Sequence, residues 1–155
     1  MATIKKGLDP LLLEQVKLTC DGAIANSSIA ACGGIVRDYI ENMLLAFAAK
    51  LPQCSTIEAN LWAILFGLQI MQDQHVEGEI LVETDSMEAW QTLLKISSIA
   101  QVNNSLVNTT TKWISQLPVV NIFHIPRESN MRADCMAKVD LNLAVKHPKR
   151  VTLTL

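Results

Sequence analysis

The sequence predicts a single α/β domain built on a mixed β-sheet, and three observations support this fold class. The periodic segments run in the order of three strands, helix, strand, two helices, strand and helix. Short connections between the first three strands favour an antiparallel meander. The later strands alternate with helices, which requires crossovers and parallel pairing. The 155 residues are a natural length for one domain, and an apolar content of 50% supplies a core.

The first part of the domain shows the period of two that is typical of strands. Residues 16–21 alternate apolar and polar side chains, and Asp21-Gly22 is expected to end this strand. Gly33-Gly34 in the second strand suggests a bulge or close packing. The expected strands are residues 16–21, 30–37 and 43–48, with a turn at 38–42.

The second part begins with helical spacing from Ile57 to Met71, for which Ser55 is a plausible N-cap. Two prolines, Pro118 and Pro126, end the segments before them. The further elements expected are a strand at 79–84, helices at 86–95 and 106–117, a strand at 119–125 and a helix at Ser129–Ala144. Residues 1–14 are expected to be a leader or linker, 15–144 the domain and 145–155 a tail.

Composition excludes several classes of protein. The formal charge is −2, which disfavours a strongly cationic protein that binds nucleic acid tightly by itself. The four cysteines form no Cys-x-x-Cys pair, so we expect free thiols in a reducing compartment rather than zinc ligands. No apolar stretch reaches the length of a membrane span. We therefore expect a soluble intracellular protein, nuclear or cytoplasmic, with no targeting signal.

Four acidic residues from separate predicted elements are the strongest functional signal. Gathered carboxylates bind hard divalent cations, and Mg²⁺ is usually completed by substrate phosphate oxygens. Two such ions side by side can cut a phosphodiester. The residues are Asp21 in Leu-Thr-Cys-Asp-Gly-Ala, Glu58 in Ser-Thr-Ile-Glu-Ala, Asp85 in Leu-Val-Glu-Thr-Asp-Ser, and Asp134 in Arg-Glu-Ser-Asn-Met-Arg-Ala-Asp.

Three of these acids also have ordinary structural explanations. Asp21 precedes a glycine, and Asp-Gly is a common turn pair. Glu58 completes the capping-box sequence Ser55-Thr56-Ile57-Glu58. Asp85 follows a strand and could cap the next helix. Each explanation is reasonable when its residue is taken alone.

The joint pattern favours one site. Asp134 lies among small apolar residues, where a carboxylate is costly unless it is paired or metal-bound. Asp21 and Asp85 each follow the expected carboxyl end of a strand, where ligands of open α/β sheets gather. If those strands are parallel neighbours, the two aspartates lie side by side, and like charges so close need a cation.

Five motifs together resemble the ribonuclease H fold family, and most closely the ribonuclease H-like, reverse-transcriptase-associated domains abundant in plants. The resemblance covers roughly residues 15–144. The motifs are Val16-Lys17-Leu18-Thr19-Cys20-Asp21-Gly22-Ala23, Cys32-Gly33-Gly34-Ile35-Val36-Arg37-Asp38, Glu58-Ala59-Asn60-Leu61-Trp62-Ala63-Ile64, Val82-Glu83-Thr84-Asp85-Ser86, and His124 to Asp134.

The resemblance implies a ribonuclease H-like five-stranded mixed sheet in the order 3-2-1-4-5 with helices on both faces. It also implies an endonuclease that uses two Mg²⁺ or Mn²⁺ ions to hydrolyse the RNA strand of an RNA–DNA hybrid. Asp21 would then bridge the two ions, with Asp134 at the ion that activates water. Glu58 and Asp85 would hold the other ion, beside the leaving 3′-oxygen.

Departures from the family pattern support a second hypothesis. Residues 96–102 hold no Lys or Arg where many active members carry a basic protrusion, and Gln53–Thr56 lacks the usual asparagines. The mobile histidine of several members aligns with Glu128 from the strand side and with His124 from the Asp134 side. The alternative is a catalytically weak or inactive domain, derived from a mobile element, that binds nucleic acid or protein. An exonuclease of this fold is disfavoured, because such enzymes usually place two acids one residue apart on the first strand.

Overall fold

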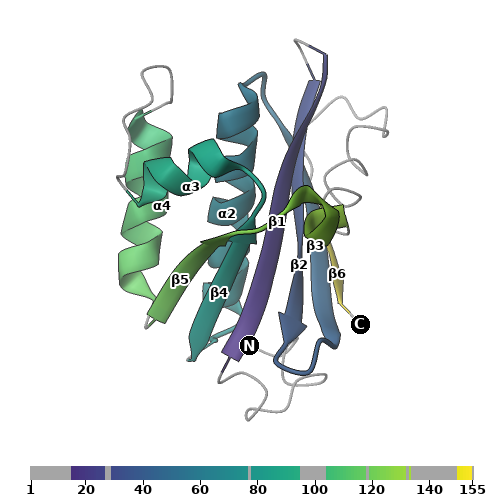
Figure 1. Cartoon of the computed structure of the whole chain (residues 1–155), viewed down its shortest axis with the longest axis vertical. Helices are drawn as coiled ribbons and strands as arrows, with labels where there is room; N and C mark the ends of the chain where they lie inside the picture. The colour runs from purple at the N-terminus through teal and green to yellow at the C-terminus, as the bar shows by residue number, and fades with distance from the viewer. Residues whose placement is uncertain are drawn as a thin grey trace.

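A computed structural model describes residues 15–26, 29–76, 78–94, 104–117, 119–131, 133 and 150–154. Its described strands form one sheet in the order β5-β4-β1-β2-β3-β6 (Figure 1). The first five reproduce the order 3-2-1-4-5, so the predicted fold is confirmed. The strands are β1 (Gln15–Asn26), β2 (Ile29–Asp38), β3 (Met43–Leu51), β4 (Glu79–Thr84), β5 (Val119–His124) and β6 (Arg150–Thr154).

Pairing within the sheet follows the predicted directions. β1, β2 and β3 form an antiparallel meander. β4 runs parallel to β1, and β5 runs parallel to β4. β6 pairs antiparallel with β3 inside the segment that we expected to be a tail. Its pairing with a distant strand is a tertiary contact that no local pattern predicts.

One strand boundary was predicted wrongly. β1 does not end at Asp21-Gly22 but continues to Asn26, because both residues stay paired with β2, at Gly33 and Cys32. Asp21 therefore is not in a turn. What ends near Asp21 is the parallel pairing with β4, whose last register pair is Cys20 with Thr84.

Three described helices accompany the sheet: α2 (Thr56–Asp73), α3 (Met87–Leu93) and α4 (Asn104–Gln116). α2 packs on β1 and β2, and α4 packs on α2. After β5 comes a 3-10 turn, η2 (Arg127–Asn130), and Met131 and Ala133 are helical. The rest of the predicted helix at Ser129–Ala144, which was to cover the second face, lies outside the described residues.

The core lies between α2 and one face of the sheet. Leu18 and Val82 from the strands and Leu61 and Ile64 from α2 are fully buried. Gly67 lets α2 approach β1 closely, because a Cβ there would lie 2.4 Å from Cδ2 of Leu18. Within the described part of the chain, no helix is both long and apolar enough to cross a membrane.

Candidate active site

The register of β1 and β4 brings two of the predicted acids together. Cys20 is opposite Thr84, and Asp21 and Asp85 are the next residues of their chains. Because neighbouring strands lie about 5 Å apart, the two aspartates start from adjacent backbone positions. Asp21 is 6% exposed and the side chain of Asp85 is 8% exposed. The two aspartates thus start from adjacent backbone positions, and both side chains are largely shielded from water.

A close contact between α2 and β1 brings the first turn of α2, which includes Glu58, near the part of β1 that includes Asp21. A Cβ on Gly22 would lie 2.4 Å from the carbonyl carbon of Ala59 and 2.6 Å from the nitrogen of Asn60. Only a residue without a side chain allows this approach. Asn60 strengthens it, since its Oδ1 accepts a hydrogen bond from Gly22 N–H (3.1 Å) and its Nδ2 donates to Thr56 O (2.9 Å). The residues adjoining Asp21 and Glu58 therefore touch.

The carboxylate of Glu58 has a structural partner of its own. Oε1 of Glu58 accepts a hydrogen bond from Ser55 N–H (3.0 Å), and Oγ of Ser55 accepts one from Glu58 N–H (3.2 Å). This is the predicted capping box, and Ser55 is confirmed as the N-cap of α2. A metal ion at Glu58 would share this carboxylate with the cap.

Asp85 is not the cap of α3. Ser86 takes that role, because its Oγ accepts a hydrogen bond from Ala89 N–H at 3.2 Å. The structural explanation for Asp85 is therefore wrong. Its Oδ2 instead lies 3.8 Å from Nε of Arg127, a side chain that is 90% exposed.

The two auxiliary candidates lie on different elements. His124 is the last residue of β5, and its Nε2 lies 3.2 Å from the main-chain oxygen of Asp85. The ring of Trp90 is tilted against it, with 6.3 Å between the ring centroids. Glu128 lies on η2, where it is exposed. His124 thus borders the site from a rigid strand and Glu128 from the turn after it.

The turn η2 is fixed to the sheet by a buried asparagine. Asn130 is fully buried, and its Nδ2 donates a hydrogen bond to Cys20 O at 3.0 Å. Its Oδ1 is buried and has no hydrogen-bond partner among the described residues. Asp134, the fourth predicted acid, follows Asn130 by four residues and lies outside the described residues.

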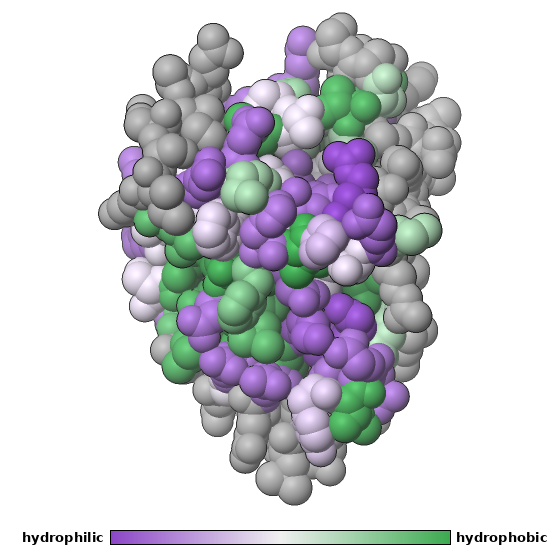
Figure 2. Space-filling view, in the orientation of Figure 1, coloured by the Kyte–Doolittle hydropathy of each residue, from purple (hydrophilic) through white to green (hydrophobic). Residues whose placement is uncertain are grey.

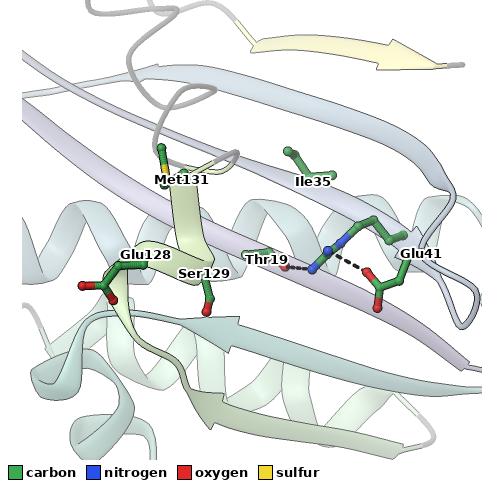
Figure 3. Close-up of a pocket in the computed structure, with 7 residues that line it drawn as sticks. Thr19, Ile35, Glu41, Glu128, Ser129 and Met131 are labelled. Atoms are coloured by element: carbon green, nitrogen blue, oxygen red, sulfur yellow. Dashed lines mark hydrogen bonds and ion pairs between the residues drawn. The ribbon is translucent and has the colours of Figure 1, made fainter.

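A pocket of about 350 Å³ is lined by residues of β1, β2 and η2, and a charged cluster borders it (Figure 3). Arg37 donates to Glu41 (2.6 Å), Glu83 (3.2 Å) and Thr19 (3.1 Å). Lys17 donates to Glu41 at 2.7 Å, and this hydrogen bond lowers the pKa of the Glu41 carboxyl. The pocket is lined by Thr19, Ile35, Arg37, Glu41, Glu128, Ser129 and Met131.

Hydrophilic residues gather across this face of the molecule (Figure 2). The region of β5 is more hydrophobic and includes the exposed side chains of Val119 and Phe123. The face seen in Figure 2 is thus mostly polar, with a more hydrophobic region around β5.

Comparison with known proteins identifies the family. Residues 19–139, which include all four predicted acids, match the reverse transcriptase-like family. The chain belongs to this family. It is also 28% identical over 131 residues to an Arabidopsis thaliana protein, "Putative ribonuclease H protein At1g65750", covering 84% of this chain. The match spans only 21% of that protein's length.

Solved structures confirm the fold of this reverse transcriptase-like domain. RNase H1 from Halobacterium salinarum superposes with a TM-score of 0.74 at 20% identity, covering 83% of this chain and 98% of that one. LC11-RNase H1 in complex with an RNA/DNA hybrid gives 0.70 at 22% identity, covering 82% and 99%. The prototype foamy virus protease-reverse transcriptase gives 0.67 at 18% identity, covering 84% of this chain and 21% of the viral one.

The side chains of Asp21 and Asp85 in this reverse transcriptase-like domain are of the kind that suits a hard divalent cation, because both are carboxylates on neighbouring backbone positions. The site is not complete among the described residues: no group of three or more His, Cys, Asp or Glu side chains there could hold a metal ion.

Sequence reasoning missed Arg127, Asn60 and Asn130, all of which support the site. Asn60 could have been noticed, because it is a polar residue on an otherwise apolar stretch of α2. Arg127 and Asn130 have no signal of their own, because their partners are distant in the sequence.

Proposed function

We propose that this domain is a divalent-metal-dependent endonuclease that hydrolyses the RNA strand of RNA–DNA hybrids. The observation that carries the proposal is the register of β1 and β4, which sets Asp21 beside Asp85 at the end of their parallel pairing. Family membership adds support, since the matched residues include the whole acidic quartet. So does the fold shared with an RNase H1 that was crystallised with an RNA/DNA hybrid.

In this proposal each carboxylate has a distinct position. Asp21 would contribute to holding both Mg²⁺ or Mn²⁺ ions, Asp134 would hold the ion that activates the attacking water, and Glu58 and Asp85 would hold the ion that neutralises the leaving 3′-oxygen. When bound, the ions lower the pKa of the water and neutralise the leaving oxygen. The burial of Asp21 and Asp85 supports this arrangement, because low exposure strengthens their electrostatic attraction for a cation.

The capping bond gives Glu58 a second role in the proposal. Its Oε1 accepts from Ser55 N–H, while a carboxylate has a second oxygen and further lone pairs to offer. Glu58 can thus hold α2 at its first turn and ligate an ion with its other oxygen. Both auxiliary candidates are exposed, and the ring of His124 lies within hydrogen-bond distance of the Asp85 main-chain oxygen.

Cleavage of an end-labelled RNA–DNA hybrid tests the proposal. The wild-type chain should cut only the RNA strand, and only when Mg²⁺ or Mn²⁺ is added. Asp21→Asn and Asp134→Asn should each abolish cleavage, while Asp73→Asn on the exposed end of α2 should not. Circular dichroism should show all three variants folded. An intact hybrid after incubation of wild-type protein with either ion would refute the proposal.

One observation favours a non-enzymatic alternative. Among the described residues the carboxylates do not form a group of three, and Glu58 is engaged by its cap. A domain with this arrangement could bind nucleic acid or protein without cutting. Calorimetry that shows cation binding, together with no cleavage of hybrid, RNA or DNA, would favour this reading.

A further inference from the structure

The turn η2 is held across the ends of the two strands that carry the paired aspartates. At its start, Ile125 N–H donates to Thr84 O at 2.9 Å. At its end, Nδ2 of Asn130 donates to Cys20 O at 3.0 Å. The two acceptor residues directly precede Asp85 and Asp21 in the chain. Side chains on η2 are therefore positioned beside the site by its own strands.

Arg127 is the cation that this turn presents. Its side chain is 90% exposed, and Nε lies 3.8 Å from Oδ2 of Asp85, whose side chain is 8% exposed. Because the guanidinium stays in water and the two atoms are 3.8 Å apart, this ion pair is weak on the side of Arg127 and exchanges easily. The guanidinium offers five N–H donors in a planar fork that matches phosphate oxygens. Arg127 can therefore leave Asp85 for a stronger anion.

Two further cations of the described part of the chain lie near this site, and both are engaged with acidic side chains. Lys17 and Arg37 both bind Glu41, and Arg37 also binds Glu83. Two positive side chains thus face two negative ones in a closed cluster. Because this cluster is neutral as a whole, it has little net attraction for phosphate. Among the cations that the structure describes near this site, Arg127 is the one outside this cluster.

We infer that Arg127 binds a backbone phosphate of the nucleic acid at this site, and that it rests on Asp85 when no divalent cation is there. The inference rests on the proposed function and names a substrate-binding residue for it. A cation at Asp85 and the guanidinium repel each other, so cation binding turns Arg127 toward the substrate. Arg127 therefore lowers the affinity of the site for a divalent cation and raises its affinity for the nucleic acid.

Opposite effects of one substitution test this inference. In the wild-type chain and in Arg127→Ala, Mn²⁺ binding is measured by calorimetry without nucleic acid. Hybrid binding is measured by fluorescence anisotropy in Ca²⁺ over a range of salt, with gels to confirm that the hybrid stays intact. Arg127→Lys keeps the charge but loses the fork. Lys112→Ala, on the exposed side of α4, is the matched loss of one charge elsewhere.

Arg127→Ala should bind Mn²⁺ about two- to fivefold more tightly, because a weak competing ion pair is gone. It should bind the hybrid about tenfold more weakly. The slope of log affinity against log salt should fall by about 0.7–0.9, the value for one phosphate contact. Arg127→Lys should fall between Arg127→Ala and wild type in hybrid affinity, and Lys112→Ala should match wild type.

Unchanged hybrid affinity and salt slope in Arg127→Ala would overturn the inference, as would unchanged Mn²⁺ affinity. A merely structural role would weaken both kinds of binding together and lower the melting temperature, which also contradicts it. A wild-type chain that binds the hybrid but never cuts it would refute the proposed enzyme activity. The effect of Arg127→Ala on hybrid affinity would still test the inference about Arg127. If the wild type binds no hybrid, both proposals fail.

Discussion

Replacing Gly22 by alanine should separate α2 from β1 at the point that brings Glu58 to Asp21. The new Cβ would lie 2.4 Å from the carbonyl carbon of Ala59 and 2.6 Å from its Cβ and from the nitrogen of Asn60. These are mostly backbone atoms inside the first turns of a helix, so they cannot rotate away. Gly22 has no positive φ, so backbone conformation does not oppose alanine. The whole cost is steric.

The magnitude follows from two opposing terms. Overpacking of a rigid site costs about 1–3 kcal/mol. Alanine also lowers the conformational entropy of the unfolded chain, which stabilises the folded state by about 0.4–1 kcal/mol. Because backbone must move here, we expect the upper end, a net loss of about 2 kcal/mol in unfolding free energy. For a chain of this length this lowers the melting temperature by about 4–8 °C.

Gly67→Ala is the matched control, because its Cβ meets a neighbour at the same 2.4 Å. That neighbour is Cδ2 of Leu18, the end of a side chain that can change rotamer. Alanine inside α2 also gains about 1 kcal/mol of helix propensity. Gly67→Ala should therefore be less destabilising than Gly22→Ala by at least about 1 kcal/mol.

Urea unfolding followed by circular dichroism measures both free energies. Hybrid cleavage, assayed where both variants remain folded, should be lower in Gly22→Ala than in Gly67→Ala. Equal stability of the two variants would refute the reasoning that the α2 backbone cannot yield. Full cleavage by a destabilised Gly22→Ala would show that this contact does not position Glu58.

Three further outcomes are expected. Ser55→Ala should lower the unfolding free energy by about 1 kcal/mol through loss of the N-cap. Glu58→Gln should lower it by less and should abolish cleavage. Urea unfolding and the cleavage assay together distinguish the capping role from the proposed metal-binding role. Asn130→Ala should cost about 1–3 kcal/mol in urea unfolding, because the buried Cys20 carbonyl loses its side-chain donor. Burial, with a smaller contribution from Glu58, raises the pKa of the Cys54 thiol to about 11. Alkylation of Cys54 by iodoacetamide, followed by mass spectrometry, should therefore be slow at pH 8 and become faster toward pH 11. Glu58→Gln should shift this increase in rate to lower pH.

Much of the fold was predictable because its signals are local. The helical spacing that starts after Ser55 predicted α2, and the capping box is a pattern of neighbouring residues. A short strand around Ile80-Leu81-Val82 was predicted before Asp85, and β4 fills the whole segment Glu79–Thr84 that was expected to hold it. The parallel neighbours β1 and β4 followed from the order of strands and helices.

The errors arise where contacts in the folded chain select one of several roles that a local pattern allows. Asp21-Gly22 reads as a turn, yet β2 holds both residues in a strand and α2 requires the glycine. Asp85 reads as a cap, yet Ser86 has the better position for that bond. A local pattern states what a residue can do, and its neighbours in space select among the options.

The sequence by itself determined the succession of strands and helices along the chain, the start of α2 and the positions of the acids. These depend on periodicity, capping and chain connectivity, which act over a few residues. Only the tertiary structure decided that Asp21 lies inside a long strand, that Gly22 seats α2, and that η2 brings Arg127 to Asp85. Those outcomes depend on contacts between segments tens of residues apart, which form only when the sheet and α2 are packed.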